Sequence, residues 1–180
     1  GTTTLKATTS NDITLDNASN DFQGAVKIPT GNDVTLVDAN AIDLGVSAVS
    51  GTYAVTATSG NITDSGNLTI TGAATFITVA TGSDIILDSS GNAFATNVTM
   101  RAGNGSNAAF GNITFVDSAA VKLHSSAGTN GDLFIDANPD RAVGGNLSIT
   151  ATTGNITQGA AVTVTGTSSF TTLTTDADIT

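Results

Sequence analysis

Short stretches in which apolar and polar residues alternate recur along the whole chain. Such alternation predicts half-buried β-strands, because successive side chains of a strand point to opposite faces of its sheet. The stretches lie at residues 13–15, 34–36, 55–57, 68–70, 85–87, 98–100, 113–115, 133–135, 147–149 and 162–164. No segment between them carries the apolar stripe of an amphipathic helix. The pattern predicts an all-β protein with no helices of note.

Clusters of Gly, Asn, Asp and Ser separate these predicted strands. Glycine and asparagine tolerate positive φ, and Asn and Asp side chains can hydrogen-bond the local backbone, so we interpret the clusters as corners. They lie at residues 31–33, 59–61, 65–67, 90–92, 104–105, 130–132 and 144–146.

One long phrase of the sequence occurs twice. Residues 51–85 return at residues 145–179 without a gap, with Gly60-Asn61-Ile62-Thr63 repeated from Gly154 to Thr157. Internal repetition of this kind is typical of solenoids, in which each unit buries its apolar face only against its neighbours.

The two ends of the chain also share a phrase. Residues 1–5 and 12–14 match residues 166–170 and 178–180, with one residue inserted between the two parts. The last residues therefore begin the kind of module that the first residues begin, and we expect the chain to be a window from a longer periodic polypeptide. The predicted modules span residues 1–71, 72–165 with an insertion around 92–146, and 166–180, the start of a further module.

The spacing of the strands selects among the all-β folds. Main strands return roughly every 15 to 22 residues, which suits one circuit of a three-sided coil. A sandwich would need hairpins with two-residue turns, and only Asn104-Gly105 and Asn130-Gly131 have that form. We predict one continuous parallel β-helix, or β-solenoid, of about nine coils, which at roughly 4.8 Å per coil would be on the order of 45 Å long.

The core of such a coil should consist of stacked columns of Val, Ile and Leu, while Thr and Ser between them point to solvent. The phenylalanines are expected to fill wider corners of the same core: Phe22, Phe76, Phe94, Phe110, Phe115, Phe134 and Phe170.

Composition narrows the choice of partner. Hydrophobic residues make up 39% of the chain and are regularly spaced, which disfavours disorder. Fifteen acidic residues outnumber five scattered basic ones, so the formal charge is −10. Phosphate contacts need clustered Lys and Arg, so no nucleic-acid partner is expected.

Composition also bears on location. The longest apolar stretches, such as residues 73–80, are broken by Thr and fall far short of the roughly 20 residues of a membrane helix. We therefore expect no membrane insertion. The chain has no Cys, hence no disulfides, and an acidic, Thr- and Asn-rich, Lys-poor repeat suits an extracellular protein of the bacterial cell surface.

Several phrases resemble the shaft repeats of filamentous-haemagglutinin-like proteins, which are giant two-partner-secreted bacterial surface exoproteins. The resemblance rests on residues 11–17, 31–45 and 66–72, and it covers nearly the whole chain, with residues 92–146 fitting least well. It implies a right-handed parallel β-helix that is exported through an outer-membrane partner. It further implies display as a long fibre used in adhesion, aggregation or contact with other cells.

Candidate catalytic chemistry is sparse. His124 is the only histidine, and a general base needs a positioned nucleophile or carboxylate beside it. Four charged residues lie near it in sequence without a spacing that specifies a reaction: Asp132, Asp136, Asp140 and Arg141. We interpret His124 as a surface or corner residue. No enzymatic activity, catalytic residue or cofactor is predicted.

Other binding motifs are incomplete. The Gly-rich nonapeptide of calcium-binding β-rolls is absent, its nearest approach being residues 144–146, so no metal-binding residue is assigned. Thr-x-Thr pairs of the kind used by ice-binding solenoids are intermittent. Glycosylation acceptors in form occur at Asn17, Asn61, Asn67, Asn97, Asn112, Asn146 and Asn155.

These observations predict a structural protein, the stalk of a large secreted bacterial surface fibre or adhesin. Its partners would be neighbouring modules of the same chain or identical chains in a fibre, with a host or cell-surface glycan or protein bound through regions outside these residues. The alternative is a subunit of a self-assembling extracellular filament or sheath. Weaker alternatives are an ice-binding or a carbohydrate-binding β-solenoid.

Overall fold

The computed structural model describes residues 1–103, 111–124, 132–135, 142–159 and 161–180. Every element assigned within those residues is a β-strand, and every pairing between strands is parallel. In this described part of the chain no helix is long and apolar enough to cross a membrane. The predicted all-β parallel solenoid is confirmed.

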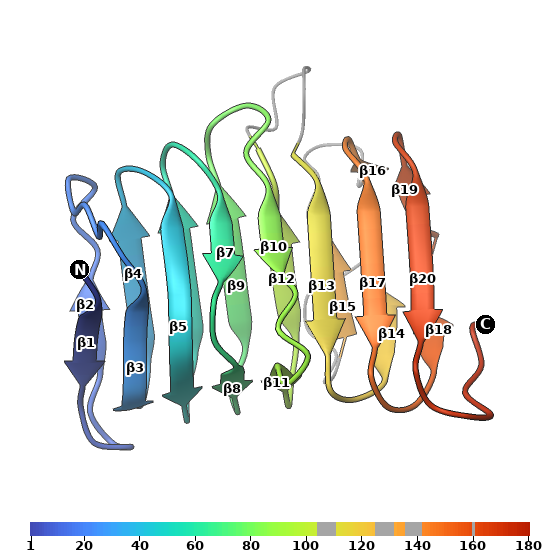
Figure 1. The fold of residues 1–180 in the computed structure, drawn as a ribbon, viewed down its shortest axis with the longest axis horizontal. Coiled ribbons are helices and arrows are strands. Elements are labelled where there is room, and N and C mark those ends of the chain that lie inside the picture. The colour runs from blue at the N-terminus through green and yellow to red at the C-terminus, as the bar shows by residue number, and fades with distance from the viewer. Residues whose placement is uncertain (104–110, 125–131, 136–141, 160) are drawn as a thin grey trace.

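Two long sheets form opposite faces of the coil, and short strands occupy its corners (Figure 1). The first sheet contains, in spatial order, β1 (Thr3–Lys6), β3 (Val26–Gly31), β5 (Ile42–Val49), β7 (Ile62–Asp64), β10 (Ile85–Leu87), β13 (Ile113–Asp117), β17 (Leu147–Ala151) and β20 (Ser168–Thr172). The second contains β2 (Ile13–Leu15), β4 (Val34–Asp38), β6 (Tyr53–Ala57), β9 (Ala74–Thr78), β12 (Val98–Arg101), β15 (Asp132–Ile135), β14 (Val121–His124) and β18 (Ile156–Gln158). The corner strands are β8 (Leu68–Ile70) with β11 (Ala93–Phe94), and β16 (Ala142–Val143) with β19 (Thr163–Val164).

The coil is right-handed. In Figure 1 the strands of the first sheet run downwards in front, those of the second run upwards behind, and the chain advances from left to right. Parallel strands joined by a crossover almost always take this hand, because right-twisted strands pack back onto the sheet only that way. The handedness implied by the family resemblance agrees with this arrangement.

The coil count and the circuit length differ from the prediction. The structure has about seven turns rather than about nine, so the rod is roughly 34 Å long at ~4.8 Å per coil. Circuits are longer than predicted because corner loops vary in length: Ile42 pairs with Ile62, whereas Ile113 pairs with Leu147, 34 residues later. The cross-section has two long sides and short corner strands instead of three equal sides.

Nine of the ten stretches predicted from alternation lie within strands, and the tenth, residues 162–164, lies within β19 except for Val162, which precedes that strand; several strands went unpredicted. In β5, Gly45 interrupts the apolar pattern, and in β9 the inward positions include only Ala74 and Phe76 as apolar side chains. A strand of three to five residues needs only two inward apolar side chains, which is too short a signal to recognise by periodicity alone.

Inward side chains stack in columns along the axis, as predicted. One column in the first sheet joins Ile62, Ile85, Ile113 and Leu147 in register, and all four side chains are buried. A row of aromatic rings continues through the core, with centroids 5.8 Å apart for Tyr53 and Phe76, 6.1 Å for Phe76 and Phe94, and 5.2 Å for Phe94 and Phe115. Phe22 and Phe170 are partly buried near the ends, and the side chains of Phe110 and Phe134 lie outside the described residues.

The two copies of the repeated phrase lie on opposite faces of the solenoid. In the first copy β6 belongs to the second sheet and β7 to the first, whereas the equivalent β17 and β18 of the second copy belong to the first and second sheets. The equivalent corner strands of the two copies also lie at opposite corners: in Figure 1, β8 lies at the lower corner and β19 at the upper one. The phrase is therefore turned by half a circuit. Either face accepts it, because both need the same short strands with two inward apolar side chains.

Candidate functional site: the open ends of the coil

Asn and Asp side chains at one corner link each coil to the next. The backbone N–H of Asp84 donates to Asn61 Oδ1 at 2.9 Å, and that of Asn112 donates to Asp84 Oδ1 at 2.6 Å. The series continues with the N–H of Asn146 on Asn112 Oδ1 at 2.8 Å and that of Thr167 on Asn146 Oδ1 at 2.9 Å. The sequence predicts that corner side chains of this kind bond the local backbone. These four side chains instead accept hydrogen bonds from the backbone of the following coil.

Buried carboxylates close other corners. Asp64 accepts hydrogen bonds from the N–H of Asp88 at 2.8 Å, the N–H of Ser89 at 3.3 Å and the Asn92 side chain at 2.7 Å. Burial raises the pKa of the Asp64 carboxyl above its ordinary value, although these hydrogen bonds act in the opposite direction. Asp117 is similar, because burial raises its pKa against hydrogen bonds from backbone N–H groups, including that of Ala119 at 3.1 Å. These carboxylates hold the fold together. Sequence reasoning missed them, since Asn92 is 28 residues from Asp64.

The polar residues near the only histidine are described in part. The backbone of His124 pairs with that of Phe134, and Asp132 pairs with Lys122, between β14 and β15. The side chains of His124 and Asp132 lie outside the described residues, as do three whole residues: Asp136, Asp140 and Arg141. Within the described part of the chain, no group of three or more His, Cys, Asp or Glu side chains is arranged to hold a metal ion.

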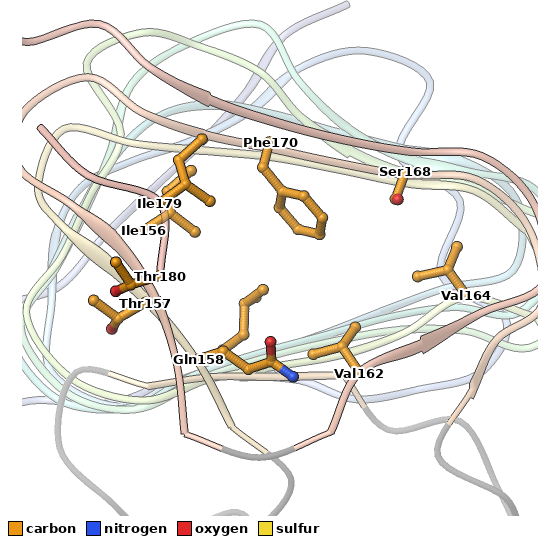
Figure 2. A pocket seen from close by; sticks show the side chains of 10 residues that line it. Ile156, Thr157, Gln158, Val162, Val164, Ser168, Phe170, Ile179 and Thr180 are labelled. Atoms are coloured by element: carbon orange, nitrogen blue, oxygen red, sulfur yellow. The ribbon is translucent and has the colours of Figure 1, made fainter.

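The C-terminal end of the coil is hollow. A cavity of about 360 Å³ opens there, and Figure 2 shows Phe170, Ile179 and Val164 around it. Its lining, which we call the C-terminal groove, consists of Leu123, Ile156, Thr157, Gln158, Val162, Val164, Ser168, Phe170, Ile179 and Thr180. The Ile179 side chain is 54% exposed. The groove is the interior of the coil, uncovered where the stacked columns stop.

The N-terminal end is apolar in the same way. Leu5, Ile13 and Leu15 pack against the core but are only partly buried, whereas Val34 and Leu36 in the next coil are fully buried. The outer edges of β1 and β20 are unpaired in the first sheet, and that of β2 is unpaired in the second, whereas the outer edge of β18 pairs with the last residues of the chain through a bridge between Ile156 and Ile179. Unpaired edges beside exposed apolar side chains can accept a further strand.

A second groove runs over the outer face of the first sheet. It has a volume of about 310 Å³ and is lined by Asp84, Ile86, Asn112, Ile113, Thr114, Asn146, Leu147, Ser148, Thr167 and Ser169. Its outward side chains are mainly Thr and Ser, and no aromatic ring lies in it. The open ends of the coil are therefore the more distinctive surfaces of the described residues.

Comparison with known proteins gives one family. The model of the family described as repeats of unknown function (DUF5649) matches residues 1–28, 31–101 and 110–180, nearly the whole chain. No curated protein and no solved structure matches the chain.

Proposed function

We propose that this chain, which belongs to the family described as repeats of unknown function (DUF5649), is a shaft segment of a large secreted bacterial surface fibre. Its work is mechanical. The shaft holds a binding region away from the cell for adhesion or aggregation, and its partners are the neighbouring modules.

The observation that carries this proposal is the continuous column of buried side chains along the axis, which runs from Ile62 through Ile85 and Ile113 to Leu147 in register. Burying such side chains stabilises by roughly 25 cal/mol per Å² of apolar surface. A core that extends along the axis, coil upon coil, suits a rod.

The internal construction suits a stiff rod. Two parallel sheets run the length of the coil, and the corner series from Asn61 to Thr167 adds a second set of hydrogen bonds along the axis. The chain has no Cys, so this cohesion needs no disulfide. Repeats of this kind gain stability from contacts between neighbouring units.

The resemblance of residues 11–17, 31–45 and 66–72 to filamentous-haemagglutinin-like shaft repeats supports the finer proposal. On that basis the fibre is a two-partner-secreted exoprotein displayed on the bacterial surface. Neither a nucleic acid nor membrane insertion enters the proposal.

The test is an immunoblot of cells that produce the protein, with an antibody raised against residues 1–180. We expect a polypeptide many times larger than these residues, and we expect protease added to intact cells to remove it while a cytosolic marker stays intact. A polypeptide no larger than residues 1–180, or one shielded from the protease, would overturn the proposal.

A further inference from the structure

The outer face of the second sheet carries a column of side chains with one acidic and one basic end. The strands β2, β4, β6, β9 and β12 lie side by side there and pair in register (Figure 1). Half-buried outward side chains follow one another along the axis: Val37, Thr56, Ile77 and Arg101. Asp16, which is exposed and directly follows β2, takes the place next to Val37, because the residues that precede these two are paired. The column therefore runs from a carboxylate to a guanidinium.

A second outward column on the same face is uncharged. Its members stand two residues before those of the first column: Thr14, Thr35, Ala54, Thr75 and Thr99. We call the side chains of both columns the Thr face. Neither Asp16 nor Arg101 forms a hydrogen bond or an ion pair within the described part of the chain, so both charges are available to a partner.

The repeated phrase supplies a comparison within the same chain. Its second copy lies on the first sheet, where Ser148 takes the place of Ala54 and Thr171 the place of Ile77. All four side chains point outward from their strands. A face that only has to remain hydrated carries hydroxyl groups at both positions, as the second copy does. The Thr face instead presents the methyl groups of Ala and Ile to its surroundings, which favours contact with another protein surface.

The order of the charged column makes the Thr face complementary to itself. Thr56 is the third of the five members, so a two-fold axis that passes beside it, parallel to the strands, reverses the column in a second copy. Val37 then faces Ile77 of the second copy, and Asp16 faces Arg101 of the second copy. Every facing pair in this column either buries methyl groups or joins opposite charges.

We propose that two copies of this chain pair face to face through the Thr face, with their axes antiparallel. Such an interface uses the same patch on both partners, as two-fold pairs of identical chains do. The two Asp16–Arg101 ion pairs select the antiparallel sense and the register. Asp33, at the corner beside the Thr face, then faces Ala73 of the second copy rather than another charge. A parallel arrangement would instead place two Asp16 carboxylates at one level of the pair and two Arg101 guanidinium groups at another.

The size of the Thr face indicates a weak pair. Five strands about 4.8 Å apart and about five residues at roughly 3.3 Å each give a face of roughly 400 Å², about half of the ~800 Å² that each partner of a standard interface contributes. Association of single copies is therefore measured at high protein concentration. The pairing itself is independent of the shaft function. Only one consequence rests on the proposed function, namely that shafts extending from two facing cells meet in this antiparallel sense.

Charge reversal tests the partners that the pairing brings together. D16R gives a face with two basic ends and R101D a face with two acidic ends, so like charges meet twice in a pair of either variant. An equimolar mixture of the two variants restores opposite charges at both places. In sedimentation equilibrium of residues 1–180 at up to about 1 mM, we expect each variant alone to associate at least about 10-fold more weakly than the parent, and the mixture to recover to within about threefold. Circular dichroism melting checks that both variants fold.

A crosslink tests the geometry. The chain has no Cys, so T56C introduces a single thiol, which lies at the proposed two-fold axis. Because packed sheets lie about 10 Å apart, a bismaleimide of about that span should join two copies of this variant. The matched control is T150C, the equivalent position in the second copy of the repeated phrase, on the outer face of the first sheet.

We expect the T56C variant to give crosslinked dimers, the T150C variant to give at least about 10-fold fewer, and D16R added to T56C to reduce the dimers to the level of the control. Equal crosslinking of the two thiols, or none, would overturn the inference. So would self-association that neither charge reversal weakens, as end-to-end stacking of the coils would produce. The immunoblot for the shaft function reads polypeptide size and surface exposure, so either proposal can fail without the other.

Discussion

The side-chain oxygen of Asn112 accepts the backbone N–H of Asn146 at 2.8 Å, although the two residues are 34 positions apart. The same bond joins residues only 23 apart at Asn61 and Asp84. The same corner hydrogen bond therefore forms whether 23 or 34 residues separate its two partners. Long circuits are tolerated because the entropic cost of closing a loop rises only slowly with its length.

Replacing Asn112 by Ala should lower the free energy of unfolding by about 0.5–1 kcal/mol, because the exposed Asn146 N–H then exchanges its side-chain acceptor for water. Urea unfolding followed by circular dichroism measures the change. The matched control is Asn146→Asp, which keeps a side-chain oxygen that can accept the backbone N–H of Thr167. An Asp already fills this role at another corner, where the Asp33 carboxylate accepts the N–H of Thr52 at 2.7 Å. Equal losses in the two variants would contradict a role for the side-chain acceptor.

Replacing Ile70 or Ile149 by Asp should disrupt the circuit that contains it, because both side chains are buried and a buried unpaired charge costs several kcal/mol. Thermal melting should show a large loss of stability. Two exposed residues, Thr69 and Thr163, provide the controls, since changing either to Ser should have little effect. If all four variants melt alike, the assignment of inward and outward faces is wrong.

Stability should depend on the ionisation of Asp117, whose pKa is raised by burial. The folded state then holds this proton above the pH, about 4, at which the unfolded chain releases it, so the carboxyl's contribution to stability decreases as pH rises through that window. Asp117→Asn removes this dependence while keeping an oxygen for the Ala119 N–H. In urea unfolding from about pH 4 upwards, the free energy of unfolding of the variant should therefore increase relative to that of the parent protein as pH rises. A constant difference would exclude the site as the source.

The Tyr53 hydroxyl is buried without a hydrogen bond, and the hydroxyl of nearby Ser47 donates to the carbonyl of Gly45. Burying an unsatisfied polar group is unfavourable, so Tyr53→Phe should leave the free energy of unfolding unchanged or raise it by up to about 1 kcal/mol. The melting temperature should accordingly stay the same or rise. Tyr53→Ala should cost about 3–5 kcal/mol, because it also removes the ring packed on Phe76. Destabilisation by Tyr53→Phe would reveal a partner for the hydroxyl.

The candidate site was foreseen in outline only. Repetition of residues 1–5 at 166–170 led to the expectation of a continuing array, which predicts apolar ends for any excised stretch of coil. The lining of the groove was not predictable, because it brings together Leu123, Val164 and Ile179 from three separate passes of the chain. Which residues meet there depends on how many corner residues separate the strands.

The sequence by itself determined the strand type, the inward and outward faces and the stacked solenoid, because these follow from a two-residue period and from repetition. Only the tertiary structure decided the number of coils, the half-circuit turn between the two copies of the repeated phrase, and the pairing of Asp64 with Asn92. The reason is that axial neighbours are set by the summed lengths of strands and corners. The alternation of apolar and polar residues does not indicate how many strand and corner residues make up each coil.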